Sequence, residues 1–139
     1  MGRVFVAAKA LIEKDGAFLA LKQKVEGHEL WDLPGGKIEF SEAPEETLRR
    51  EVMEEVGLRV DELRLIGVYW FFRITDGDQV VCLIYSCKAK EGEIDLTRNP
   101  GQDNIVHYEY MTPAAFMDEA YTVSHSSMKE AIRQWARLV

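Results

Sequence analysis

The stretch "GKIEFSEAPEETLRREVMEEVGL", residues 36–58, decides the fold class of this sequence. Its second part predicts a helix over 41–56, because Pro44 falls in the first turn, acidic residues crowd the start and Gly57 follows the last turn. Three glutamates stand at i, i+3 and i+4 on this helix, namely Glu51, Glu54 and Glu55. Like charges so placed repel by roughly a few tenths of a kcal/mol per pair, so their grouping needs a reason.

The position of the glutamates around the helix suggests that reason. At about 100° per residue, Leu48, Val52 and Val56 share one arc, which should face a sheet. The three glutamates occupy the neighbouring arc, at the edge of the buried face and close to solvent. Mg²⁺ takes oxygen ligands and is often held by a few carboxylates together with substrate phosphates. A divalent cation would therefore turn the repulsion into attraction, whereas a solvated acidic helix face is the alternative.

The segments around this helix alternate between strand and helix patterns. Two strands joined at Asp15-Gly16 are expected within 4–24, and a loop centred on Pro34-Gly35-Gly36 within 31–40. Further strands are expected at 65–74, 79–89 and 105–112, and further helices at 112–120 and 124–139. Thr112 should cap the former helix, and the latter is amphipathic through Met128, Ile132, Trp135 and Leu138. The fold class is therefore α/β or α+β, with helices covering a mixed sheet.

Length and composition indicate one domain, 1–139, in which 47% of residues are hydrophobic and 29% are charged. No apolar run is long enough for a transmembrane helix, and the first residues lack a signal-peptide pattern. The expected location is the cytoplasm. Cys82 and Cys87 are five apart in one predicted strand, so they should point to opposite faces as buried thiols that do not bridge each other.

The charge balance limits the class of partner. With 17 Lys+Arg against 24 Asp+Glu the net charge is −7, and no basic stripe is visible. A nucleic-acid polymer is therefore not expected as a partner, and neither is a membrane. A small phosphorylated ligand is compatible with this charge if a cation mediates its binding.

Residues 36–58 resemble the Nudix box, Gly-x5-Glu-x7-Arg-Glu-U-x-Glu-Glu-x-Gly-U, where U is a bulky aliphatic residue. Every specified position is filled without a gap, by Gly36, Glu42, Arg50, Glu51, Val52, Glu54, Glu55, Gly57 and Leu58. The preceding "LWDLPGGKIE" looks like the usual lead-in, and "VHYEYMTPAAF" is similar to a late strand-and-helix segment of many members. The MutT-like branch of the family is the most similar.

The resemblance implies an α/β/α sandwich whose box forms a loop-helix-loop beside a mixed sheet. It also implies metal-dependent hydrolysis of a nucleoside diphosphate linked to another group. The residues expected to hold Mg²⁺, or Mn²⁺ in its place, are Glu51, Glu54, Glu55 and the backbone carbonyl of Gly36. Arg50 would pair with Glu42 to fix the loop against the helix, and Gly57 would be a structural helix cap. Glu54, or a glutamate outside the box, would orient or deprotonate the attacking water.

The chemistry of pyrophosphate supports these roles independently of the resemblance. Its oxygens repel an incoming nucleophile, and bound cations neutralise that charge and acidify a coordinated water. A carboxylate beside the cation can then accept the proton. Gly35 and Gly36 suit a loop that approaches phosphate through its backbone. An ordinary turn after Pro34 is the alternative for the glycines, and an exposed helix arginine is the alternative for Arg50.

Several residues outside the core of the box are weaker candidates. Phosphate contacts are considered for three lysines, Lys22, Lys24 and Lys37, whose usual role at strand ends is only solvation. Glu39 and Glu109 are candidate additional metal ligands, and Glu109 matches the place of a further metal-binding glutamate in MutT-like members. Stacking on a base is considered for Trp31, Trp70, Phe71 and Phe72, against a role in the core. His125 could line a pocket.

The expected substrate is a (d)NTP or a modified nucleotide, bound by a monomer or homodimer. The oxidised-guanine specialist of the MutT-like branch keeps an Asn just before the last helix, where this sequence has "YTVSHSSMKE", so specificity for oxidised dGTP is not indicated. A regulatory domain that binds a nucleotide without cutting it is the first alternative. A structural or protein-interaction domain with a coincidental acidic helix is the second. Metal-dependent turnover separates the hydrolase from both.

Overall fold

The computed structural model describes residues 2–98 and 104–138. Within these residues the strands are β1 (Val4–Lys14), β2 (Ala17–Val25), β3 (His28–Asp32), β4 (Gly35–Lys37), β5 (Arg59–Phe72), β6 (Gln79–Glu91) and β7 (Ile105–Met111). The helices are α1 (Pro44–Val56), the 3-10 turn η1 (Leu96–Arg98), α2 (Pro113–Phe116) and α3 (Ser126–Leu138). No described helix has both the length and the apolar character needed to span a membrane.

The sheet contains parallel and antiparallel pairs, and β1 and β2 separate from each other along most of their length. The strand order is β3-β2-β1-β6-β5, with β7 pairing β2 and β4 pairing β1. β1 runs parallel to β6, while its other partners are antiparallel. Only the end of β1 pairs with β2, at Glu13 and Lys14, whereas its middle pairs with β4 through Ala7, Ala8 and Lys9. The short strand β4 therefore enters the gap between β1 and β2 and brings its glycines to the middle of the molecule.

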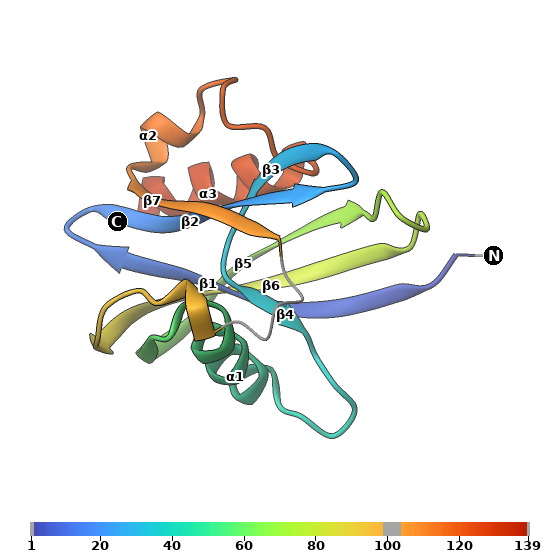
Figure 1. Ribbon diagram of the computed structural model, residues 1–139. Helices are drawn as coiled ribbons and strands as arrows, with labels where there is room; N and C mark the ends of the chain where they lie inside the picture. The colour runs from blue at the N-terminus through green and yellow to red at the C-terminus, as the bar shows by residue number, and fades with distance from the viewer. Residues whose placement is uncertain (1, 99–103, 139) are drawn as a thin grey trace.

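The helices α1 and α3 cover opposite faces of the sheet (Figure 1). Because side chains alternate along β1, Ala8, Ala10 and Ile12 join one core with α1, while Ala7 and Leu11 join another with α3. The α1 side of the core contains Leu48, Val52 and Val56, which are all fully buried as predicted. The α3 side contains Met128, Ile132 and Trp135, also as predicted, while the side chain of Leu138 lies outside the described residues.

The predicted class, helices covering a mixed sheet, is the observed one, but several boundaries differ. The box helix begins at Pro44 and not at 41, because Ser41 has φ +74° and Ala43 is extended as the N-cap. The strand expected at 65–74 begins at Arg59 and ends at Phe72, and its register with β6 shifts at three places. The helix expected at 112–120 is only the turn Pro113–Phe116.

Two smaller predictions are confirmed. The hydroxyl of Thr112 caps α2 by accepting a hydrogen bond from the Ala115 N–H at 3.2 Å. Cys82 and Cys87 are buried free thiols on opposite faces of β6, one in each core. Burial raises the pKa of Cys82 to about 11 and that of Cys87 to about 12, so both remain protonated thiols.

Candidate active site

The segment 33–43 between β3 and α1, here called the glycine loop, differs from the loop expected around Pro34-Gly35-Gly36, because Gly35–Lys37 pair with β1 as the short strand β4. This segment is attached to α1 through Glu55. The Gly35 N–H donates a hydrogen bond to Glu55 Oε1 at 2.7 Å, and the Glu55 residue is only 4% exposed. The loop is also attached to β1, because the Ala10 N–H donates to the Pro34 carbonyl at 2.8 Å. Glu55 is therefore the innermost of the three box glutamates, and its carboxylate fixes where the loop backbone lies.

Gly35 and Gly36 are packed too closely for any side chain. Gly35 has φ +143°, and an added Cβ would lie 2.1 Å from the Ala8 carbonyl oxygen. An added Cβ at Gly36 would lie 2.4 Å from Glu51 Cδ and 2.6 Å from Glu51 Oε2. The Glu51 carboxylate therefore lies directly against the bare backbone of Gly36, an approach that only glycine allows.

A positive charge already lies between two of the box carboxylates. Arg50 Nη1 is 3.0 Å from Glu51 Oε1 and 3.4 Å from Glu54 Oε2. Glu51 is mostly buried, whereas the Glu54 side chain is 44% exposed. The arginine thus offsets the repulsion that the sequence predicts for these glutamates, and Glu54 is the member of the set that solvent can reach.

Arg50 and Glu42 form the pair that the resemblance to the Nudix box implies. Arg50 Nε and Nη2 donate to Glu42 Oε2 and Oε1 at 2.7 and 3.0 Å, a bidentate geometry. The Thr47 hydroxyl donates to Glu42 Oε1 at 2.6 Å, and the Glu39 N–H donates to the same oxygen at 3.3 Å. Hydrogen bonds from Arg50 and then Thr47 lower the pKa of Glu42 to about 2. The pair ties the loop at 39–42 to the first half of α1.

We expect Glu42→Ala and Arg50→Ala both to lower the free energy of unfolding and to be non-additive, because each removes their shared contact. The loss should be larger for Arg50→Ala, which also removes the contacts to Glu51 and Glu54. The coupling should depend on pH. Since the pKa of Glu42 is lowered on folding, the stability it gives is present above pH 4.5 and is lost as pH falls toward about 2. Urea unfolding of the wild-type protein, the two single variants and the double variant at a series of pH values measures this coupling. Fully additive losses near neutral pH would contradict the pairing.

The three carboxylates do not form a ready-made metal cluster. Within 2–98 and 104–138, no three Asp, Glu, His or Cys side chains converge closely enough to hold an ion. The donor set nevertheless fits a hard divalent cation, since it consists of carboxylate oxygens beside the backbone of Gly36. Arg50 Nη1 shows that a cation can lie between Glu51 and Glu54. A metal ion at that point would require this guanidinium nitrogen to move aside.

Comparison with known proteins assigns the family. A profile of the NUDIX domain matches residues 3–133, which is nearly the whole chain. This chain belongs to the NUDIX family. The predicted family, fold class and enzyme class, a Nudix hydrolase, are thereby confirmed.

Individual relatives agree with this assignment. A MutT-like protein of Streptomyces ambofaciens is 40% identical over 119 residues, which are 84% of this chain and 70% of that protein. An 8-oxo-dGTP diphosphatase of Proteus vulgaris is 32% identical over 66 residues, which are 46% of this chain and 59% of that protein. The crystal structure of a MutT Nudix hydrolase from Burkholderia pseudomallei superposes with a TM-score of 0.77 at 26% identity, covering 95% of this chain and 98% of that one.

The additional acidic candidates lie in different surroundings from the Nudix box glutamates. Glu39 is 3.9 Å from Arg50 Nη2 and its side chain is 69% exposed, so it belongs to the rim of the box. Glu109 lies on β7, where it accepts a hydrogen bond from the Tyr121 hydroxyl at 3.0 Å and is 3.9 Å from His107. Among the described residues, these contacts join Glu109 to Tyr121, in the segment before α3, and to its neighbour His107, and none of them joins it to α1.

The three candidate lysines also differ in their surroundings. Lys22 on β2 pairs with Glu29 of β3 at 3.4 Å, and Lys24 is exposed near the end of β2. Lys37 is the residue that follows Gly36 on β4, and its ammonium lies 4.1 Å from the centre of the Phe5 ring. Of the three, Lys37 is therefore the one that belongs to the Nudix box itself.

A buried polar network behind the glycine loop escaped the sequence analysis. Lys9 Nζ lies 3.0 Å from Asp32 Oδ2, while Asp32 Oδ1 accepts hydrogen bonds from the Leu33 N–H at 2.8 Å and the Tyr69 hydroxyl at 2.6 Å. Burial opposes the charged form of Lys9, but the charges of Asp32 and Glu55 help to outweigh it and raise its pKa. In the sequence, the one sign of this network is Lys9, a charged residue inside the apolar run 4–12.

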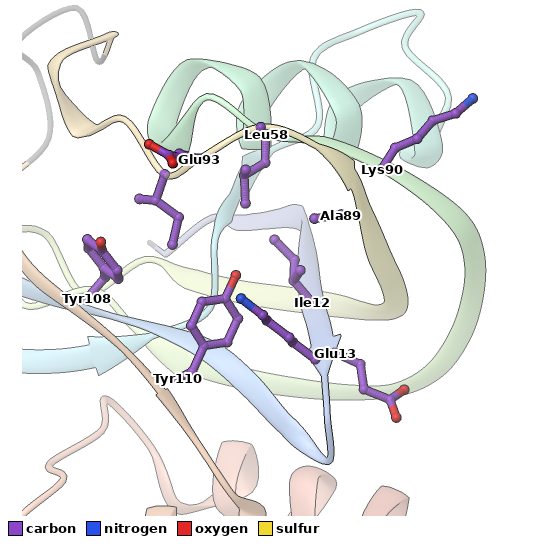
Figure 2. A pocket seen from close by; sticks show the side chains of 11 residues that line it. Ile12, Glu13, Leu58, Ala89, Lys90, Glu93, Tyr108 and Tyr110 are labelled. Atoms are coloured by element: carbon purple, nitrogen blue, oxygen red, sulfur yellow. The ribbon is translucent and has the colours of Figure 1, made fainter.

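Two cavities differ in their relation to the box. One of about 230 Å³ lies among β2, β3 and β5 and is lined by Leu30, Asp32, Phe71, Phe72 and Arg73, so it reaches the residues just before the glycine loop. A larger one, about 620 Å³, is lined by Ile12, Leu58, Tyr108 and Tyr110, with none of the box glutamates (Figure 2).

The aromatic residues considered for stacking on a base divide between core and surface. Trp31 is buried and meets Tyr121 edge-on, with ring centres 5.2 Å apart. Trp70 is partly exposed beside His125, with ring centres 5.4 Å apart. Phe71 and Phe72 are the two that line the smaller cavity.

Proposed function

We propose that this Nudix protein is a Mg²⁺-dependent pyrophosphohydrolase that cleaves a nucleoside diphosphate linked to another group, with a (d)NTP or a modified nucleotide as substrate. The observation that carries the proposal is the packing of the box. Glu55 binds the loop N–H of Gly35, Glu51 lies against Gly36, and Glu54 stays open to solvent on the same stretch of α1. This combination places three carboxylates around a short backbone segment whose glycines carry no side chain of their own.

The residues that would hold Mg²⁺, or Mn²⁺ in its place, are Glu51, Glu54, Glu55 and the Gly36 carbonyl. When bound, the metal would neutralise phosphate charge and make a water molecule more acidic. Arg50 offsets the negative charge of Glu51 and Glu54 in the absence of a bound ligand. Its bidentate bond to Glu42 limits how far the guanidinium can move.

In the reaction, a water oxygen joins one phosphorus, the bridging P–O bond breaks, and the departing phosphate carries away the electron pair. The attacking water must lose a proton, and Glu54 or a glutamate outside the box would take it. The exposure of the Glu54 side chain, the largest among the three glutamates, supports Glu54. Glu55 is suited to holding the loop and not to exchanging protons with solvent, because it is buried against Gly35.

The cavity between β3 and β5 is a suitable place for the nucleoside part of the substrate. Phe71 and Phe72 supply apolar lining, and Asp32 connects the cavity to the glycine loop through its bond to the Leu33 N–H. The Proteus relative, named for a nucleoside triphosphate substrate, supports this class. The absence of Asn from 121–127 does not favour oxidised guanine as the base.

The proposal predicts phosphate or pyrophosphate release at slightly alkaline pH with Mg²⁺. The panel would contain dNTPs, oxidised dNTPs, ADP-ribose, dinucleoside polyphosphates and nucleotide sugars, each with and without EDTA. We expect release from at least one phosphoanhydride substrate and its loss in EDTA. No release across the panel, with nucleotide binding still seen by thermal shift, would instead support the regulatory alternative.

A further inference from the structure

The cavity of about 620 Å³ exists because two parts of the sheet separate. β1 and β2 pair only at Glu13 and Lys14, and β7 continues the sheet from β2, so a space remains between β7 and the ends of β1 and β6. The segment 92–94, which follows β6, closes this space on another side. The cavity lies on the α1 side of the sheet, and its volume is within the usual range of small-molecule sites.

One wall of the cavity is aromatic and the facing wall is aliphatic. Tyr108 and Tyr110 stand two residues apart on β7, so both side chains lie on the same face of that strand. Figure 2 shows both tyrosines on the opposite side of the cavity from Leu58, with Ile12 beside them. Tyr108 is 39% exposed, so its ring is accessible to a ligand. A space between phenol rings and aliphatic side chains fits a flat aromatic ring, which can stack on the tyrosines.

The charged groups of the cavity are divided between its two sides. Lys14 Nζ lies 5.2 Å from the centre of the Tyr110 ring, and among the described side chains no carboxylate forms an ion pair with it. Burial raises the pKa of Tyr110, so its hydroxyl keeps its proton and can donate a hydrogen bond. Glu93 lies across the cavity from Tyr110, whereas Glu13 and Lys90 point away from it (Figure 2). One side therefore offers donors to an anion, and the other offers a carboxylate to N–H groups.

We propose that this cavity is a second ligand site, separate from the hydrolysis site, for a flat aromatic compound that carries both an acid group and an amino group. The ring stacks on Tyr108, the acid group binds Lys14 and the hydroxyl of Tyr110, and the amino group donates to Glu93. Aromatic aminocarboxylates and adenosine monophosphate share this chemistry. None of the box glutamates lines the cavity, so the inference does not depend on the proposed hydrolysis. A cavity that holds only water is the competing explanation.

Methyl NMR spectra recorded in EDTA locate binding without turnover. The two probes are 5-amino-1-naphthoate and adenosine monophosphate, each titrated into the full chain. We expect the methyl resonances of Ala89 and Ile94, which line this cavity, to shift saturably with at least one probe. Saturation by the naphthoate supports a carboxylate ligand, and saturation by the nucleotide alone supports a nucleotide. Shifts confined to Leu30 and Ile74, which line the smaller cavity, or no saturable shift with either probe, would overturn the proposal.

Variants of the lining residues test the proposed contacts with the probe that binds. Lys14→Met should weaken its binding by about tenfold, because it removes a charge-assisted contact, and Lys14→Arg should retain it. Tyr108→Leu should weaken binding by about fivefold through the loss of stacking. Lys129→Met is a matched control, since Lys129 Nζ also lies near a ring, 5.6 Å from the centre of Phe116, on the α3 side. Equal affinity of Lys14→Met and the wild-type protein would overturn the proposal.

The independence of the two sites has its own readout. Lys14 and Tyr108 are exposed, so their variants should keep the wild-type fold, which thermal unfolding verifies. Tyr108→Leu should also keep kcat for the best substrate within about twofold, because its side chain lies outside the box. Loss of turnover together with loss of probe binding in this folded variant would assign the cavity to the hydrolysis site and overturn a separate one.

Discussion

Glu55→Gln should lower kcat by at least about 100-fold while leaving the protein folded. The substitution removes the charge of the innermost box carboxylate, which the proposed mechanism requires for holding the cation. It keeps an amide oxygen that can accept the hydrogen bond from the Gly35 N–H, so the loop should remain in place. Hydrolysis of the best substrate with Mg²⁺, together with thermal unfolding, measures both parts of the prediction.

The matched control is Glu45→Gln, which changes the same residue type on the same helix. Glu45 lies in the first turn of α1 and is exposed, so its amide variant should retain activity within about twofold. Turnover of Glu55→Gln similar to that of the wild-type protein would exclude Glu55 from the reaction. Loss of activity accompanied by unfolding would instead limit Glu55 to holding the loop.

Gly35→Ala should lower the free energy of unfolding by at least about 3 kcal/mol, because it combines a strained backbone with a steric overlap. The new Cβ would lie 2.1 Å from the Ala8 carbonyl oxygen and 2.8 Å from Lys9 Cα, and neither backbone atom can move independently of β1. The strand pair β1–β4 and the hydrogen bond to Glu55 should both be disturbed. Urea unfolding measures the loss.

Gly16→Ala separates the two causes of this loss. Gly16 also has a positive φ, of +80°, but its added Cβ would meet no atom within 4 Å. Its expected cost is therefore only the left-handed backbone penalty, roughly 1–2 kcal/mol. If Gly35→Ala were no more destabilising than Gly16→Ala, the close approach of β4 to β1 would not be a constraint on the fold.

The amino-acid sequence by itself determined the box helix and its chemistry. Pro44 and Gly57 limit the helix through local backbone preferences, and the 3.6-residue period sets Leu48, Val52 and Val56 on its buried face. The resemblance to the Nudix box implied the pairing of Glu42 with Arg50, and the bidentate contact confirms it. These features could be read because each depends on residues close together in the chain.

Only the tertiary structure decided which distant residues meet. Asp32 joins Lys9 and Tyr69, residues 23 and 37 positions away, because β1, the end of β3 and β5 converge behind the glycine loop. The approach of Arg3, Lys37 and Arg73 to the Phe5 ring likewise depends on the pairing of β4 with β1 and on the turn after β5. Strand pairing and register are set by burial and by contacts across the sheet, which local propensity and periodicity do not specify. For that reason the helix and its glutamates followed from the sequence, while the surroundings of the loop followed from the fold.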